Sequence, residues 1–158
     1  MIKFLATTLL LDSSFDYREQ CRVLVPAHVS APDQGAFGQQ FEGLIYDAVS
    51  ASRGRALVLF TSYAALNQAA EGLTGALAEQ GVAVLAQGRD GSREQLLTQL
   101  QAGPPCAIFG TASFWEGIDV PGDALQCVII DKLPFAPPND PLVQARSKEL
   151  ESRGRDPF

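Results

Sequence analysis

The sequence has 158 residues, of which 46% are hydrophobic and 19% are charged, and its formal net charge at pH 7 is −6. This length is enough for one domain with a hydrophobic core, and the composition is typical of a globular protein. The acidic balance differs from the basic footprint of a free-standing nucleic-acid-binding protein. Any contact with nucleic acid therefore has to be local or depend on another domain.

Cysteine spacing argues against a metal site. Cys21, Cys106 and Cys127 show no CxxC pattern, and the only histidine, His28, has no nearby ligand partner. We expect free thiols in a reducing compartment and hence a cytoplasmic protein. No run reaches the roughly 18 apolar residues that span a membrane. Residues 1–11 resemble a secretory signal only faintly, because a small-residue cleavage site is missing.

The predicted elements of the first half begin with a short strand over residues 22–26 and a loop over residues 27–39. Apolar residues then recur at helical spacing, which predicts a helix over residues 39–52. The continuous apolar run at residues 56–60 predicts a strand that is buried on both faces.

The second half continues the alternation of strands and helices. Thr61 and Ser62 offer N-cap hydroxyls to a helix that Gly81 ends, and Ser92 with Gln95 forms a capping-box pattern for the next helix. Strands are expected at residues 82–85, 106–109 and 126–131, and a final helix from residue 139 or 140 to about 152. This order predicts an α/β fold with a mainly parallel sheet and helices on both faces.

Polar residues follow each predicted strand. Because the carboxyl ends of parallel strands meet at one edge, this edge is the expected ligand site. Hydroxyls and helix N-terminal amides suit phosphate oxygens, and Arg89 adds a possible charge-assisted contact. The residues are Thr61 and Ser62, then Gln87 to Arg89, then Thr111 to Asp119, and then Asp131 and Lys132. In the alternative interpretation Ser62 only caps a helix, Arg89 is solvated, and residues 110–122 form a surface connection.

Several catalytic motifs are missing from the sequence. It contains no GxxxxGK[ST] phosphate loop and no GxGxxG dinucleotide fingerprint. A single histidine gives no convincing Ser-His-Asp set. A Rossmann-type dehydrogenase and a serine hydrolase are therefore disfavoured.

Three segments together resemble the second motor domain of the DinG and XPD-like helicases of superfamily 2. Residues 57–63 (LVLFTSY) are similar to motif IV, and residues 110–122 (GTASFWEGIDVPG) are similar to motif V in its DinG form. Residues 129–141 (IIDKLPFAPPNDP) match the run that follows motif V. The resemblance covers nearly the whole chain.

The resemblance implies a RecA-like domain from a motor that binds ATP and Mg²⁺ between two such domains and moves 5′ to 3′ along single-stranded DNA. Motif IV would place Thr61 and Ser62 near the DNA backbone. Motif V would place Thr111 and Gly117 on the DNA side, with Glu116, Gly117 and Asp119 linking this contact to the nucleotide cleft.

The resemblance also implies that parts of such a motor lie elsewhere. Residues 1–20 would be a remnant of a preceding region, and residues 21–158 a domain truncated before the arginine-bearing motif VI. The first motor domain, with its phosphate loop and in many members an iron–sulfur cluster, is missing. We therefore expect no ATP hydrolysis by this fragment alone and an uncovered apolar sheet surface. Two alternatives remain, a non-catalytic DNA- or protein-docking module and an unrelated nucleotide-binding enzyme.

Overall fold

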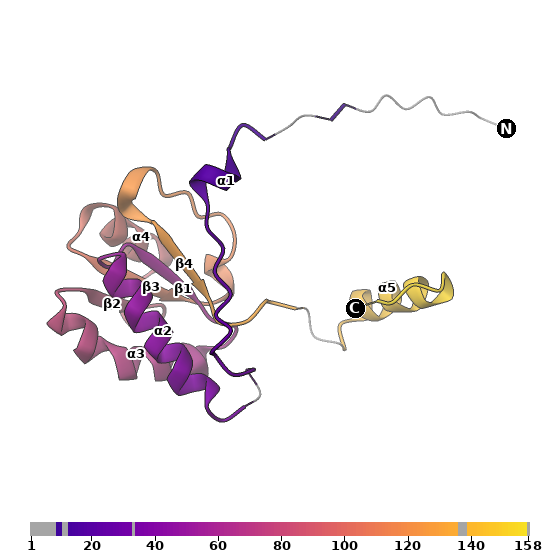
Figure 1. Ribbon diagram of the computed structural model, residues 1–158, viewed down its shortest axis with the longest axis horizontal. Helices are drawn as coiled ribbons and strands as arrows, with labels where there is room; N and C mark the ends of the chain where they lie inside the picture. Colours follow the sequence, from indigo (N-terminus) through magenta and orange to yellow (C-terminus); the bar gives the residue numbers. More distant parts are fainter. Residues whose placement is uncertain (1–8, 11–12, 33, 136–138, 158) are drawn as a thin grey trace.

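The centre of the molecule is a sheet of four parallel strands in the order β2-β3-β1-β4 (Figure 1). The computed structural model describes residues 9–10, 13–32, 34–135 and 139–157. The strands are β1 (Ala56–Leu59), β2 (Ala83–Ala86), β3 (Cys106–Gly110) and β4 (Cys127–Ile130). Leu59 of β1 is level with Gly110 of β3 on one side and Ile130 of β4 on the other. The predicted α/β fold with a RecA-like parallel sheet is confirmed.

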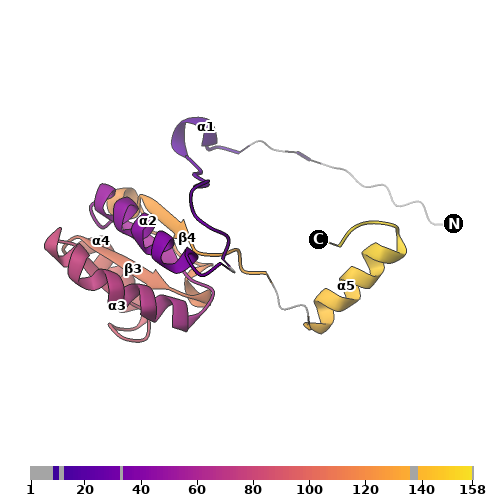
Figure 2. The same ribbon diagram turned by 60° about the horizontal axis from the view of Figure 1, so that its bottom comes forward.

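Helices connect the strands and cover both faces of the sheet. The longer helices are α2 (Phe37–Ala51), α3 (Tyr63–Glu79), α4 (Arg93–Ala102) and α5 (Pro141–Ser152). The short ones are α1 (Tyr17–Gln20) and the 3₁₀ turns η1 (Ala112–Phe114) and η2 (Gly122–Ala124). Figure 2 shows α2 and α3 side by side against one face of the sheet, and α4 packs on the other face.

Alternation along β1 explains the two layers of core. Val58 and Phe60 point toward α2 and α3. On this face the ring centroids of Phe60 and Phe109 lie 5.6 Å apart. Leu57 and Leu59 point to the opposite face and pack with apolar residues of α4. Successive strand residues point to opposite faces, so a strand covered on both sides reads as a continuous apolar run. Burying a side chain as large as Phe60 contributes roughly 1.5–3 kcal/mol.

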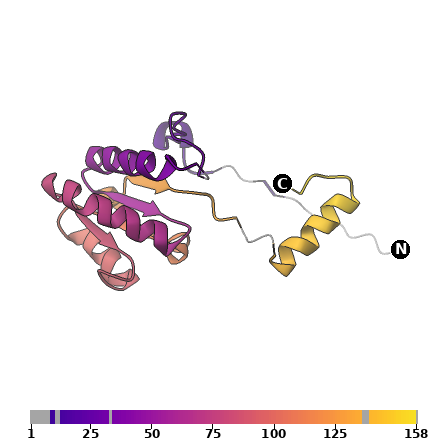
Figure 3. The ribbon, with the colours of Figure 1, turned by 90° about the horizontal axis from the view of Figure 1, so that it is seen from below.

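The edge strand β4 is less well covered than the other strands. Val128 and Ile130, on its α4-side face, are 54% and 43% exposed. An uncovered apolar sheet surface is what the sequence led us to expect. Helix α5, beyond β4, has no buried residue and stands apart from the sheet in Figures 1 and 3. None of the described helices has the length and apolarity needed to cross a membrane.

The strand predicted over residues 22–26 is wrong. Val23, Leu24 and Val25 are 84–85% exposed and belong to no strand of the sheet. Apolar β-branched residues favour a strand, but a strand also needs the hydrogen bonds of a neighbouring strand, and this segment has none among the described residues. Expectations for residues 1–8 and 136–138 lie outside the described part of the chain.

Candidate nucleic-acid interface

The carboxyl ends of the four strands meet at one edge of the sheet, which we call the carboxyl edge. The backbone N–H of Phe60 donates to the carbonyl of Gly110 at 2.9 Å, and that of Gln87 donates to Phe109 at 2.9 Å. The N–H of Asp131 donates to Leu59 at 3.0 Å. These bonds extend the strand pairing by one residue, so the polar residues that follow the strands lie side by side as predicted.

Thr111 is the most buried polar residue of this edge, at 6% exposure. Its backbone N–H and its hydroxyl both donate to the side-chain oxygen of Gln87, at 2.8 and 3.1 Å. The Gln87 amide nitrogen in turn donates to the hydroxyls of Tyr63 and Ser113, at 2.8 and 2.9 Å. Gln87 therefore connects the ends of β2 and β3 with the start of α3.

Thr61 and Ser62 are exposed at the turn from β1 into α3. The Ser62 hydroxyl caps α3 by accepting the Ala65 backbone N–H at 3.2 Å. The cap fixes the direction in which the first turn of the helix presents its amides. Thr61 follows the strand that neighbours β3, so its hydroxyl lies at the same edge as Thr111.

The loop over residues 111–119 is anchored through Phe114, which is 1% exposed. A Cβ added at Gly110 would lie 2.7 Å from Cγ of Phe114, so the glycine lets this ring pack against the end of β3. Gly117 has a φ of +66°, a conformation that favours glycine. Glu116, Gly117 and Asp119 are all exposed. With the Phe114 ring buried, Glu116, Gly117 and Asp119 lie on the surface, whereas Thr111 at the start of the loop is buried.

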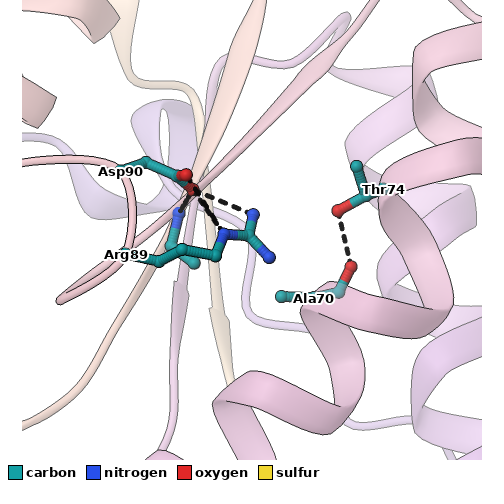
Figure 4. Close-up of polar contacts among 5 residues, drawn as sticks. Ala70, Thr74, Arg89 and Asp90 are labelled. Carbon is teal, nitrogen blue, oxygen red and sulfur yellow. Dashed lines mark hydrogen bonds and ion pairs between the residues drawn. The ribbon is translucent and has the colours of Figure 1, made fainter.

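Arg89 lies in the turn after β2, and its guanidinium is directed to the neighbouring Asp90 (Figure 4). The ion pair spans 2.9 Å, with Arg89 44% and Asp90 28% exposed in their side chains. The hydrogen bond from Arg89 to Asp90 raises the pKa of the guanidinium. Asp90 also accepts the Ala86 backbone N–H at 2.7 Å, which ties the turn to β2. Any contact of Arg89 with a ligand has to compete with this pair.

Asp131 is buried at the end of β4, with 9% exposure, and its Oδ2 atom has no hydrogen-bond partner in the described part of the structure. Burial raises the pKa of this carboxyl, while the Lys132 cation and the Thr61 backbone amide act in the opposite direction. Removing a carboxylate from water without full compensation destabilises its charged form.

Two contributors to this site were missed by the sequence analysis, Tyr63 and Arg93. Arg93, at the start of α4, contacts the loop over residues 111–119 through three backbone carbonyls. The residues that carry these carbonyls follow Arg93 by 20 to 24 positions in the chain. No local sequence pattern predicts these contacts, because only the pairing of β2 with β3 brings Arg93 and the loop together. Gln87 was noted at a strand end, but its link to Thr111 has the same long-range origin.

Metal-ligating side chains do not gather anywhere in the described residues. No group of three or more His, Cys, Asp or Glu side chains could hold an ion there. Cys21 is exposed, Cys106 is buried, Cys127 is half-buried, and all three are free thiols.

A parallel sheet with polar residues along its carboxyl edge is typical of ligand-binding α/β domains. Residues 45–158 match the family described as the helicase C-terminal domain, and the chain belongs to this family. The family match assigns this domain to the RecA-like class. It is 40% identical over 153 residues to the ATP-dependent DNA helicase YoaA of Escherichia coli K12. It is 35% identical over 147 residues to the ATP-dependent helicase DinG of Mycobacterium tuberculosis H37Rv. The 3′-5′ exonuclease DinG of Bacillus subtilis is 33% identical over 159 residues.

These matches cover nearly all of this chain but a small part of each relative. The alignment with YoaA includes 97% of this chain and 23% of YoaA, and the alignment with the mycobacterial DinG includes 92% and 22%. For the Bacillus protein the shares are 98% and 17%. The predicted resemblance to DinG-like helicases is confirmed.

Proposed function

We propose that this chain is the second motor domain of an ATP-dependent DNA helicase and holds single-stranded DNA along its carboxyl edge. The observation that carries the proposal is the position of the exposed Thr61 and Ser62, which follow β1 at the same edge of the sheet where Thr111 follows β3. The named activities of the YoaA and DinG relatives support it. Uncharged hydroxyls and amides hold phosphates through hydrogen bonds, so an acidic domain is able to bind DNA locally.

The DNA contacts are assigned to Thr61, Ser62, Thr111 and Gly117, with Arg89 as a charged neighbour. For the Thr111 hydroxyl to donate to phosphate, it would have to give up its hydrogen bond to Gln87. Glu116, Gly117 and Asp119 form the wall of the nucleotide cleft and couple it to the DNA contact. The parent protein would act in DNA repair or replication in the cytoplasm and move 5′ to 3′.

ATP and Mg²⁺ would bind between this domain and the first motor domain. The residues of this chain do not fit a complete site for them, because the sequence has no phosphate loop and the described residues contain no metal-binding cluster. Phosphoryl transfer needs a phosphate cradle, a metal and a charge-stabilising arginine together. An iron–sulfur cluster, where the parent has one, would belong to the first motor domain.

A titration of fluorescently labelled single-stranded DNA with the purified chain tests the DNA contact. We expect binding that weakens steeply as salt increases. Thr61→Val should bind about fivefold more weakly, because it keeps the shape and loses one hydrogen bond. Thr98→Val is the control, since Thr98 is exposed and its hydroxyl donates within α4 to the Glu94 carbonyl at 2.9 Å. Absence of binding at low salt, or equal loss in both variants, would contradict the proposal.

A second measurement addresses the cleft. The isolated chain should show no ATP hydrolysis above background, because its sequence has no phosphate loop and its described residues contain no metal-binding cluster. Hydrolysis that is abolished by Asp119→Ala would show that this chain contains a complete ATPase site, contrary to the proposal.

A further inference from the structure

Arg93 has a fixed position at the start of α4. It directly follows Ser92, whose hydroxyl accepts the Gln95 backbone N–H at 3.3 Å, while the Gln95 side chain accepts the Ser92 N–H at 2.8 Å. This reciprocal capping box defines where the helix begins. The stem of Arg93 therefore leaves the helix from a well-determined point, beside the loop over residues 111–119.

The guanidinium of Arg93 binds three carbonyls of that loop. Nε donates to Ser113 at 3.0 Å, and Nη2 donates to Glu116 at 3.2 Å and to Gly117 at 2.6 Å. The guanidinium carbon also lies 5.8 Å from the ring centroid of the buried Phe114. A planar group with several donors fits such a set of acceptors, whereas the ammonium of lysine is a compact point charge.

The loop has little regular structure of its own. It contains the three-residue turn η1 and a glycine with positive φ at position 117. It is also anchored by the buried Phe114 ring, by Trp115 and Ile118, which pack against the core on the α4 side, and by Gln87 at the Thr111 end. The segment from Glu116 to Gly117 is exposed, and Arg93 contacts the carbonyls of both residues. Losing Arg93 would remove the hydrogen bonds that a side chain makes to the Glu116 and Gly117 carbonyls.

We propose that Arg93 is a positioning residue that holds the loop over residues 113–117 in its DNA-binding shape. This inference rests on the proposed function, since it assigns the loop to DNA. In this proposal Arg93 acts through the loop, because its Nε and Nη2 atoms donate to the loop carbonyls.

The test compares Arg93→Lys and Arg93→Met with the unchanged chain. Arg93→Lys keeps the charge and loses the planar group of donors. Amide hydrogen exchange of residues 112–119 reports on the loop, and the DNA titration at several salt concentrations reports on binding. Urea unfolding verifies that the variants are folded. Arg146→Met is the control, because it removes an arginine charge at an exposed position of α5.

We expect both Arg93 variants to exchange faster in the loop and to bind single-stranded DNA roughly tenfold more weakly, with the salt dependence unchanged. A salt slope that falls by about one in Arg93→Met but not in Arg93→Lys would show that Arg93 contacts phosphate, and would overturn the inference. Unchanged exchange in both variants would also overturn it. If the unchanged chain binds no DNA, the proposed function fails, and the exchange rates alone decide whether Arg93 holds the loop.

Discussion

At the scale of single residues, Gly110 is where the packing behind the candidate interface leaves the least space. A Cβ there would approach Phe114 to 2.7–2.9 Å, and the ring is buried. We expect Gly110→Ala to lower the free energy of unfolding by about 1–3 kcal/mol through overpacking. Gly75→Ala is the matched control. It has no atom within 4 Å of the added Cβ and lies inside α3, so it should stabilise by roughly 0.5–1 kcal/mol. Urea unfolding of both variants measures the difference, and equal effects would contradict the packing argument.

Protonation of Asp131 should affect the stability of the folded chain. Its folded-state pKa lies above the ordinary value of 3.8, so the folded state takes up a proton more readily than the unfolded state. The unchanged chain therefore loses stability as the pH rises from 3.8 through the raised value, and nothing further is lost above it. Asp131→Asn should not lose stability in this way, because the asparagine side chain does not ionise.

The measurement is the difference in the free energy of unfolding between Asp131→Asn and the unchanged chain, taken at several pH values. This difference should become more favourable to Asp131→Asn as the pH rises through the range and then level off. Other titrating groups are common to both proteins and cancel. Asp47→Asn, at an exposed position of α2, is the control. A difference that stays constant with pH, or that falls, would contradict the assignment.

At the scale of elements, two capped helices should respond differently to the loss of their caps. Ser92 caps α4, which buries Leu96 and Leu100, whereas Asp140 caps α5, which buries no residue. We expect Ser92→Ala to lower the free energy of unfolding by about 1 kcal/mol. Asp140→Ala should reduce helix content and leave the unfolding of the sheet unchanged, because a helix of this length is marginal without packing.

Circular dichroism measures the helix content, and fluorescence of the single tryptophan, Trp115, reports on the core beside α4. A lowered midpoint in the Trp115 signal for Asp140→Ala would show that α5 packs on the sheet. An unchanged midpoint for Ser92→Ala would show that the capping box contributes nothing to the core.

The elements also show why sequence reasoning succeeds in some places and fails in others. The Ser92–Gln95 capping box and the apolar run of β1 are local signals, and both elements form where predicted. The exposed segment at residues 22–26 has the same apolar character as β1, but it could form a strand only beside another strand, which it lacks among the described residues. The contacts of Arg93 and Gln87 with the loop depend on strand order in the same way. Local patterns therefore predicted the strand ends, while the bonds between them needed the structure.

At the scale of the whole molecule, the uncovered face of β4 is the surface that we expect copies of the chain to share. Exposed apolar residues on an edge strand offer both a hydrophobic patch and unpaired backbone groups to another chain. Val128 and Ile130 provide this combination. We therefore expect the purified chain to self-associate as its concentration rises, with the β4 edge as the contact.

Val128→Lys tests this expectation, because a lysine on an edge strand opposes pairing with another edge. Sedimentation velocity over a range of concentrations should show weaker self-association for Val128→Lys than for the unchanged chain. Leu142→Lys is the matched control, since it adds the same charge and removes a similarly exposed apolar side chain, 59% against 54%, on α5. If both variants reduce association equally, net charge is the cause. If the unchanged chain stays monomeric over the same range, the expectation is wrong and the exposed apolar residues of β4 do not drive association.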